Sequence, residues 1–404
     1  MVAWLTRIFG PAHLELAEEV VQDALVKALQ QWPFSGIPEN PAGWLFAVAR
    51  NRALDVLRRN TSFHDRADAI AAELSSRAAP LSDIPEAVKD DELRMVFMCC
   101  HPELPRDGQV ALSLKTVGGF STAEIARAFL TSESTIAQRI VRAKRMVRDR
   151  RIPFELPHAS VLSERLDPVL EVIYLMFNEG YAAHAGETLV REDLCREAIR
   201  LGRLVAGSPH AGRPSAHALV ALMALQAARI PARVSASGEM VLLEDQDRSL
   251  WDGQLTALGF AHMERSIDGL DRTAYHVQAA IAAVHAAASS YEQTDWRRML
   301  ELYDDLVALN PSPVVALNRA VVLARVEGTD AALRAVARLE GDPALADYYL
   351  LPAVKGALLK ERGDEAGAAL AYAEALKRPC SEPEKRFLVR RLSDSGELTF
   401  PDLL

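Results

Sequence analysis

The residues best suited to chemistry lie between Ser121 and Arg151, and the chemistry they suit is hydrogen bonding to nucleic acid. Residues 132–152 carry seven Arg or Lys side chains against two acids. One helical face places polar and cationic side chains at spacings of three, four and three: Thr135, Gln138, Arg142 and Arg145. Cations meet phosphates, and amide or guanidinium groups can reach base edges in a major groove. The pattern predicts a surface that binds duplex DNA.

Apolar residues on another face of this segment indicate the helix that positions these side chains. They follow spacings of four, three and four, which is typical of a helix seated on a core: Ile136, Ile140, Ala143 and Val147. Ser121 and Glu124 have the spacing of a capping box for a preceding short helix, and Gly118-Gly119 ends the helix before that one. Together they predict a helix-turn-helix.

A second candidate helix runs from Pro41 to Arg59. Asn40 is a good N-cap and Pro41 a good first residue, after a Pro- and Gly-containing loop from Trp32. Its predicted buried residues are Leu45, Phe46, Ala49, Ala53, Val56 and Leu57, and a different face carries Trp44, Asn51, Asp55 and Arg58. An exposed ring among arginines suits single-stranded nucleic acid. The equal alternative is that Trp44 is a core anchor and the arginines are merely solvated.

A third helical pattern starts near Pro11. One side carries Leu14, Ala17, Val21, Ala24, Leu25 and Ala28. The other side is acidic and carries Glu15, Glu18, Glu19, Gln22 and Asp23. By itself, such an acidic face is ordinarily a solvated surface.

Composition and charge set the wider frame. A chain of 404 residues predicts two to four domains, and its Ala- and Leu-rich sequence with 6% aromatic residues favours an all-α fold. Residues 1–152 hold 20 basic and 19 acidic side chains, whereas the remainder holds 26 basic and 36 acidic ones, a balance of −10. Phosphate would repel the acidic part, so DNA binding is expected in the first part and regulation or protein contact in the second.

Several other functions are disfavoured. The four cysteines form no disulfide pattern, and we expect Cys99-Cys100-His101 to be packing at a helix end rather than a metal site. No metalloprotease, Walker or nucleophile-elbow motif is present, and Glu244, Asp245 and Asp247 fit an acidic turn or a contact to a basic domain better than a catalytic pair. We expect no enzyme, metal or cofactor, no signal peptide or membrane span, and a cytoplasmic location.

The predicted organisation has five parts. They are residues 1–60, a linker at 61–90, a helical unit at 91–152, a helical extension at 153–275 and helical repeats at 276–404. Residues 231–251 have weak periodicity and suggest a short hairpin or an irregular loop. Pro311 and Pro379 end similar segments 68 residues apart, which is twice the tetratricopeptide period of about 34 residues. Asp295-Trp296 and Gly363-Asp364 begin the corresponding helices. Paired helices of this kind stack into a concave surface.

Three motifs in this order resemble a bacterial sigma factor of the extracytoplasmic-function (ECF) group in the sigma-70 family. Leu16-Ala-Glu-Glu-Val-Val-Gln-Asp-Ala-Leu25 resembles the helix that docks on the clamp of RNA polymerase. Pro41-Ala-Gly-Trp-Leu-Phe-Ala-Val-Ala-Arg50, continuing to Arg59, resembles the helix that melts and reads the −10 element. Residues 122–144, Thr-Ala-Glu-Ile-Ala-Arg through Ile-Val-Arg-Ala-Lys, resemble the −35 reader. The motifs cover about residues 5–152, and Tyr174-Leu-Met-Phe-Asn-Glu-Gly-Tyr181 is similar to a subgroup with its own C-terminal extension.

The resemblance implies partners and contacts. The partners are core RNA polymerase and promoter DNA, with the extension contacting the sigma domains. The implied polymerase contacts are Glu19, Gln22 and Asp23. The implied −10 contacts are Ser35, Asn40, Trp44, Asn51, Arg52, Asp55, Arg58 and Arg59, with the loop 35–40 as a pocket for a flipped base. The implied −35 contacts are Ser134, Thr135, Gln138, Arg139, Arg142 and Arg145, with Arg142 or Gln138 reading bases.

The family normally has a further helix before the clamp-binding helix, and only thirteen residues precede Leu14. We therefore expect an abbreviated first domain or a start further upstream. Two alternatives stay open: a helix-turn-helix regulator that acts without polymerase, and an enzyme in the C-terminal half.

Overall fold

The computed structural model describes residues 1–59, 86–128, 131–158, 160–181, 190–209, 211–235, 239–268 and 272–395. Within these ranges the protein is all-α, as predicted, and the one extended pairing is an antiparallel bridge between Val234 and Met240. That bridge and two 3-10 turns, η3 (Leu243–Asp245) and η4 (Arg248–Leu250), form the segment of weak periodicity. The chain divides into two compact units, Met1–Val172 and Ile173–Leu404.

The first unit begins with a small helical core. α1 (Val2–Phe9), α2 (Leu14–Ser35) and α3 (Pro41–Arg59) pack together, with the turn η1 (Pro11–His13) between the first two. α1 therefore supplies a short helix within the thirteen residues before Leu14, where we expected an abbreviated first domain or a start further upstream, and it buries Trp4, Leu5, Ile8 and Phe9. The predicted loop from Trp32 is shorter than expected: α2 continues through Pro33 to Ser35, and only residues 36–40 lie outside a helix, beginning with Gly36, whose φ of 80° a helix cannot hold.

Four helices complete the DNA-binding candidate in this unit. They are α5 (Glu86–Cys99), α6 (Arg106–Thr116), α7 (Thr122–Ala128) and α8 (Glu133–Asp149). The predicted apolar stripe of α8 is buried throughout. The capping box of α7 forms as predicted, because Ser121 Oγ accepts from the Glu124 N–H at 3.2 Å and Glu124 Oε2 accepts from the Ser121 N–H at 2.7 Å. α5 begins inside the segment 61–90 predicted as a linker, and the part of that linker at 61–85 lies outside the described residues.

Buried polar contacts hold the parts of the first unit together. Asp91 on α5 is 0% exposed and accepts from Arg7 of α1 at 2.9 Å and from Arg94 at 2.8 Å. The first half of α9 (Leu162–Tyr181) is fixed by Arg165, whose guanidinium donates to the Phe97 carbonyl at 2.5 Å. For Asp91, removing either Arg7 or Arg94 would leave a buried carboxylate with one cationic partner fewer, which lowers the stability of the first unit.

The second unit is built around α11 (Pro214–Ala227), which is almost entirely buried. α10 (Glu192–Ala206), α13 (Gly253–Ser266) and α14 (Ala274–Ala287) pack on it, and the short α12 (Ile230–Arg233) follows it. A helix that is apolar on all sides must be enclosed by others, which is the position α11 takes.

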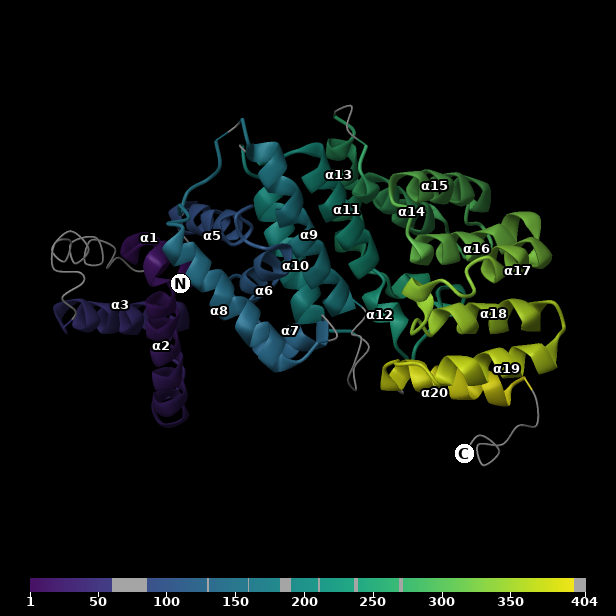
Figure 1. The fold of residues 1–404 in the computed structure, drawn as a ribbon, viewed down its shortest axis with the longest axis horizontal. Helices are drawn as coiled ribbons and strands as arrows, with labels where there is room; N and C mark the ends of the chain where they lie inside the picture. Colours follow the sequence, from purple (N-terminus) through teal and green to yellow (C-terminus); the bar gives the residue numbers. More distant parts are fainter. Residues whose placement is uncertain are drawn as a thin grey trace. The chain divides into compact units, whose positions relative to one another are not determined.

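The last six helices follow one another as neighbours, from green to yellow in Figure 1. They are α15 (Trp296–Leu309), α16 (Pro313–Glu327), α17 (Thr329–Ala337), α18 (Leu350–Glu361), α19 (Glu365–Leu376) and α20 (Glu382–Ser393). Asp295 and Asp364 cap α15 and α19, and they lie 69 residues apart, one residue more than the predicted spacing of 68. The tetratricopeptide assignment itself stays a prediction.

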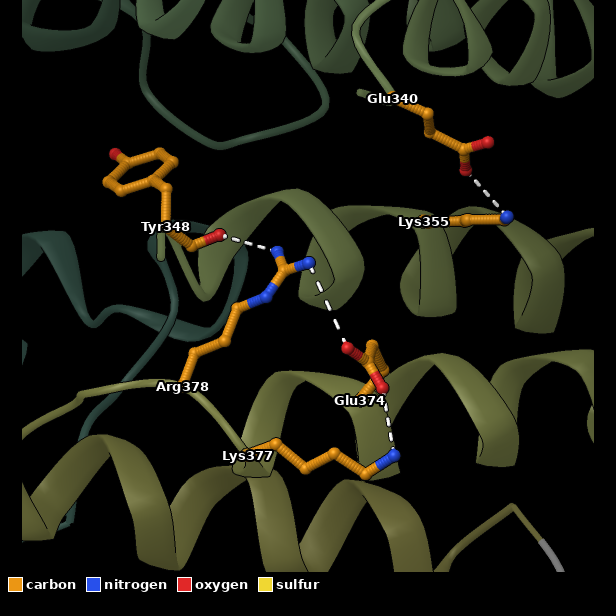
Figure 2. Close-up of polar contacts among 6 residues, drawn as sticks. All are labelled: Glu340, Tyr348, Lys355, Glu374, Lys377 and Arg378. Atoms are coloured by element: carbon orange, nitrogen blue, oxygen red, sulfur yellow. Dashed lines mark hydrogen bonds and ion pairs between the residues drawn. The ribbon is translucent and has the colours of Figure 1, made fainter. Parts of the chain in front are cut away.

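Side chains tie these helices across their ends, as Figure 2 shows. Arg378, which follows α19, donates to the Tyr348 carbonyl at 3.1 Å and lies 3.9 Å from the Glu374 carboxylate. Lys355 of α18 pairs with Glu340 at 2.6 Å. Glu340 lies in the segment between the end of α17 and the turn η5 (Pro343–Leu345). These contacts fix the register of consecutive helices.

Candidate nucleic-acid and polymerase interface

The start of α8 is organised by a serine cap. Ser132 Oγ accepts from the Thr135 N–H at 3.2 Å and lies 2.9 Å from the Ser134 hydroxyl and 2.8 Å from that of Thr135. The first two predicted −35 residues therefore also hold the helix start. Free N–H groups and hydroxyls at a helix N-terminus favour a phosphate.

A hollow of about 180 Å³ separates the start of α6 from the face of α8 that the sequence singled out. Thr135, Gln138, Arg139 and Arg142 line it, with Asp107 on the opposite side. Arg139 is paired with Asp107, Nε to Oδ2, at 3.0 Å. Gln138 and Arg142 are exposed and, in the described part of the chain, their side chains have no hydrogen bond or ion pair. These two side chains are the ones available to reach a base edge.

Arginines at the far end of α8 form exposed ion pairs. Arg145 is 70% exposed and lies 3.5 Å from Asp149, which Arg148 also contacts at 3.1 Å. Exposed pairs of this kind contribute little free energy, so phosphate can replace the carboxylate at small cost. The end of α8 suits contacts to the DNA backbone.

The predicted −10 helix, α3, is capped as expected, since Asn40 Oδ1 accepts from the Gly43 N–H at 2.8 Å. Trp44 is half-buried and meets Trp32 of α2 edge to face, with ring centroids 5.5 Å apart. It is therefore neither a full core anchor nor a freely exposed ring. Ser35 donates to the Gln31 carbonyl at 3.0 Å, which leaves its hydroxyl oxygen exposed at the loop.

Arg52 joins two of the predicted surfaces. Its Nε lies 2.7 Å from Asp23 Oδ2, and this hydrogen bond raises the pKa of Arg52. A predicted −10 contact is thus paired with a predicted polymerase contact. Asn51 is exposed and accepts from Arg50 at 3.2 Å, and Asp55 is exposed as well. The side chains of Arg58 and Arg59 lie outside the described residues.

The outer face of α2 is more apolar than the sequence pattern predicts. Glu19 and Gln22 are exposed as expected. Leu25, which the pattern placed on the core side, is 46% exposed, and Leu29 one turn later is 77% exposed. Val26, Phe34 and Ile37 are exposed too. The 22-residue helix extends beyond its core, so its second half keeps unpaired apolar side chains, which are typical of a protein-binding surface.

A second ion pair, besides Arg7–Asp91 between α1 and α5, links the two candidate modules inside the first unit. Lys144 on α8 pairs with Glu18 on α2, and their side chains are only 14% and 16% exposed. The turn η1 also packs on α8. The sequence pattern treated Glu18 as part of a solvated acidic face, and it missed this contact because the partners lie 126 residues apart.

The residues that we set aside as non-catalytic lie in structural contacts. Cys99 and Cys100 are fully buried, Cys100 Sγ lies 3.5 Å from Ser113 Oγ, and burial raises the pKa of Cys100 to about 11. Glu244 lies 3.6 Å from Arg325, and Asp247 caps η4. Among the described residues no group of three His, Cys, Asp or Glu side chains could hold a metal ion. No described helix has both the length and the apolar character that a bilayer crossing requires.

Comparison with known proteins identifies the parts of the chain. Residues 1–63 match the model of "Sigma-70 region 2" and residues 94–147 that of "Sigma-70, region 4". Residues 165–267 match a family of unknown function, DUF6596. An uncharacterized protein of Rhizobium meliloti (strain 1021), R00370, is 42% identical over 94% of this chain and 90% of its own length. The ECF RNA polymerase sigma factor SigL of Mycobacterium tuberculosis is 29% identical over 33% of this chain and 72% of its own. No solved structure matches.

Proposed function

The chain belongs to the sigma-70 family, as a factor of the extracytoplasmic-function type with a long helical extension, and on this premise we propose how its residues divide the work. We propose that α8 binds the −35 duplex through residues 134–145, with Gln138 and Arg142 at base edges. α3 and the loop before it bind the opened −10 strand. The outer face of α2 docks on core RNA polymerase.

The observation that carries this proposal is the hollow beside α8. Four predicted −35 residues line it, and two of them lack any polar partner within the described residues. A side chain that reads a base gains most when it gives up only water for the base. If it first had to break a hydrogen bond or ion pair within the protein, the free energy of that pair would offset the free energy gained from the base. The exposed apolar residues of α2 support the polymerase contact, because they have no partner within the protein to give up when another protein covers them.

The two modules have to part for this function. The names of the −35 and −10 elements place them about 25 base pairs apart, which is about 85 Å along B-DNA at about 3.4 Å per base pair. In the free chain, the Lys144–Glu18 pair holds α8 against α2, and the Arg7–Asp91 pair holds α1 against α5. We propose that binding to polymerase breaks both contacts and spreads the modules along the promoter.

We further propose that the acidic extension regulates the factor, either by contacting the two sigma modules or by stabilising the polymerase complex. The balance of −10 in residues 153–404 supports this role, because an acidic surface competes with DNA for basic helices.

In vitro transcription with purified core polymerase tests the proposal. A genomic library is transcribed with and without the chain, and start sites are mapped. We expect new start sites that share a −35 and a −10 element and co-purification of the chain with core polymerase. Binding to an operator without polymerase, and no directed start site, would favour a helix-turn-helix regulator instead.

A further inference from the structure

The second unit contains a cavity that no part of the promoter-binding proposal uses. Its volume is about 550 Å³, and it lies among α14 to α16, α18 to α20 and the segment 240–244. Small-molecule sites generally measure about 300–1,000 Å³. The cavity is therefore large enough to enclose a ligand of two or three fused or linked rings.

Aromatic side chains dominate its wall. Six of them line it: Tyr291, Trp296, Tyr303, Tyr349, Tyr372 and Phe387. Aromatic residues make up only 6% of the chain, so this is a strong local concentration. Trp296 meets Tyr291 edge to face with centroids 4.9 Å apart and His285 with centroids 5.7 Å apart. Ring faces and edges that line a cavity can pack against another planar ring.

One buried polar atom in the wall lacks a partner. His285 Nδ1 has no hydrogen-bond partner within the described part of the chain, and burial lowers the pKa of this imidazole to about 3, so the ring is neutral at physiological pH. Burial also raises the pKa of Tyr303 to about 12, so the wall carries a neutral phenol as well. Buried polar groups are almost always satisfied in native proteins, so His285 indicates a missing partner.

The charges around the cavity are unevenly paired. Arg325 lies 3.6 Å from Glu244 and 3.5 Å from Glu361, so its charge is fully paired and these three groups together carry a charge of −1. Lys360 and Arg391 also line the cavity, and in the described ranges neither has a carboxylate within 4.0 Å.

The two cations lie near each other at the end of α20. Lys360 Nζ donates to the Asp394 carbonyl at 3.0 Å, three residues beyond Arg391, and Arg391 lies 5.1 Å from the Phe387 ring centroid. Two cations without carboxylate partners in a part of the chain with a balance of −10 favour an anionic group at this rim.

We propose that this cavity binds a small aromatic carboxylic acid, with its rings among the six aromatic side chains and its carboxylate at Lys360 and Arg391. The site is independent of DNA and of polymerase, so it can be tested on the purified full-length chain alone.

Calorimetric titration with 2-naphthoate, and with naphthalene-2-carboxamide as its uncharged counterpart, measures this binding. Ala357 is an exposed residue of α18 on the cavity wall, so Ala357→Phe fills the cavity without disturbing a core. Ala366→Phe, at an exposed position of α19 away from the cavity, is the matched control. We expect 1:1 binding of 2-naphthoate with Kd below about 1 mM, at least about tenfold weaker in Ala357→Phe and unchanged in Ala366→Phe.

A second pair of variants tests the charge. We expect Arg391→Gln to weaken 2-naphthoate binding about fivefold or more and to leave carboxamide binding nearly unchanged, with Arg338→Gln, an exposed residue outside the cavity, as control. The proposal is overturned if 2-naphthoate does not bind, or if Ala357→Phe binds it as well as the native chain does. Equal affinity for acid and amide, with no effect of Arg391→Gln on either, overturns the anionic class.

Discussion

At the scale of single residues, the arginines of α8 are alike in sequence but held in different ways. Arg139 is paired with Asp107 and Arg145 with Asp149, whereas Arg142 has no polar partner in the described chain. Sequence spacing could predict that these residues share one side of a helix. It could not predict the Arg139–Asp107 pair, because Asp107 lies on a different helix and such pairing depends on tertiary packing, whereas Arg145–Asp149 is an i,i+4 pair within α8.

Because Arg142 has no polar partner in the described chain, we predict that it reads a base. Arg142→Ala should weaken binding to a −35 duplex by about 1–3 kcal/mol and relax specificity at one base position, because a bidentate base contact is lost. Arg145→Ala should lower affinity less and equally on specific and scrambled duplexes. Fluorescence anisotropy on both duplexes measures the two effects. An equal loss on scrambled DNA for Arg142→Ala would identify it as a phosphate contact.

Asp107 should act as an internal competitor of DNA. Asp107→Asn removes the carboxylate that holds Arg139, so we expect tighter −35 binding and a slope of log K against log salt that steepens by about 1. Anisotropy titrations between low and moderate salt measure this slope. Asp149→Asn is the comparison variant: its pairs with Arg145 and Arg148 are more exposed and cost little to break, so we expect a smaller change of the slope. An unchanged slope in Asp107→Asn would mean that Arg139 stays away from phosphate.

At the scale of helices, periodicity predicted α8, its apolar stripe and the α7 capping box because these depend on neighbours three and four residues apart. It failed on α2. The pattern placed Leu25 in the core, but α2 extends beyond the ends of the helices that pack on it, so Leu25 is exposed. Local spacing does not encode the length of a partner helix. Similarly, the half-buried Trp44 rests on Trp32 because α2 runs on through Pro33.

The contact between α2 and α8 should be measurable as a coupling energy. Lys144 and Glu18 are largely shielded from water, so we expect a coupling of about 1–3 kcal/mol, between the values of exposed and buried pairs. Urea unfolding of Lys144→Met, Glu18→Gln and the double variant gives this value. Additive effects of the two substitutions would show that the pair does not hold the modules together. The exposed pair Arg200–Glu197 provides a reference cycle with a smaller coupling.

A histidine pair between α11 and α13 should make the second unit sensitive to acid. His262 is 7% exposed, its Nδ1 lies 3.0 Å from His217 Nδ1, and burial, His217 and Arg265 lower its pKa to about 4. An unfolded histidine has a pKa of about 6.5, so the unfolded chain takes up the proton first as the pH falls. Neutral His262 therefore contributes fully to the free energy of unfolding above about pH 6.5. This contribution decreases as the pH falls toward 4, by about 3 kcal/mol at most.

Urea midpoints at pH 7.5 and pH 5.0 test this sensitivity. We expect His262→Gln to lose less stability between the two values than the native chain, because its side chain cannot take up a proton. His158→Gln, which removes an exposed histidine, should lose as much as the native chain. Identical losses in all three chains would assign the acid sensitivity to other groups.

At the scale of the whole molecule, composition correctly placed the promoter-binding part first and the acidic part second, because charge balance needs no knowledge of the fold. The boundary between the two units of the structure lies at Val172, not after residue 152 as predicted. The predicted break after residue 152 precedes α9, yet Arg165 contacts the Phe97 carbonyl and Glu171 pairs with Arg106, so these residues belong to the first unit. Such contacts between distant residues are invisible in local sequence.

This boundary decides how the extension must be removed to learn its role. A chain cut at residue 160 would lose buried Leu162 and Leu166 from the first unit, and its failure could reflect misfolding. A chain ending at Val172 keeps these contacts. We expect its promoter-specific transcription to differ at least severalfold from that of the full chain. A rise would mean that the acidic extension restrains the sigma modules, and a fall would mean that it stabilises the polymerase complex. Equal activity of the two chains, with −35 binding intact in both, would exclude a regulatory extension in either form.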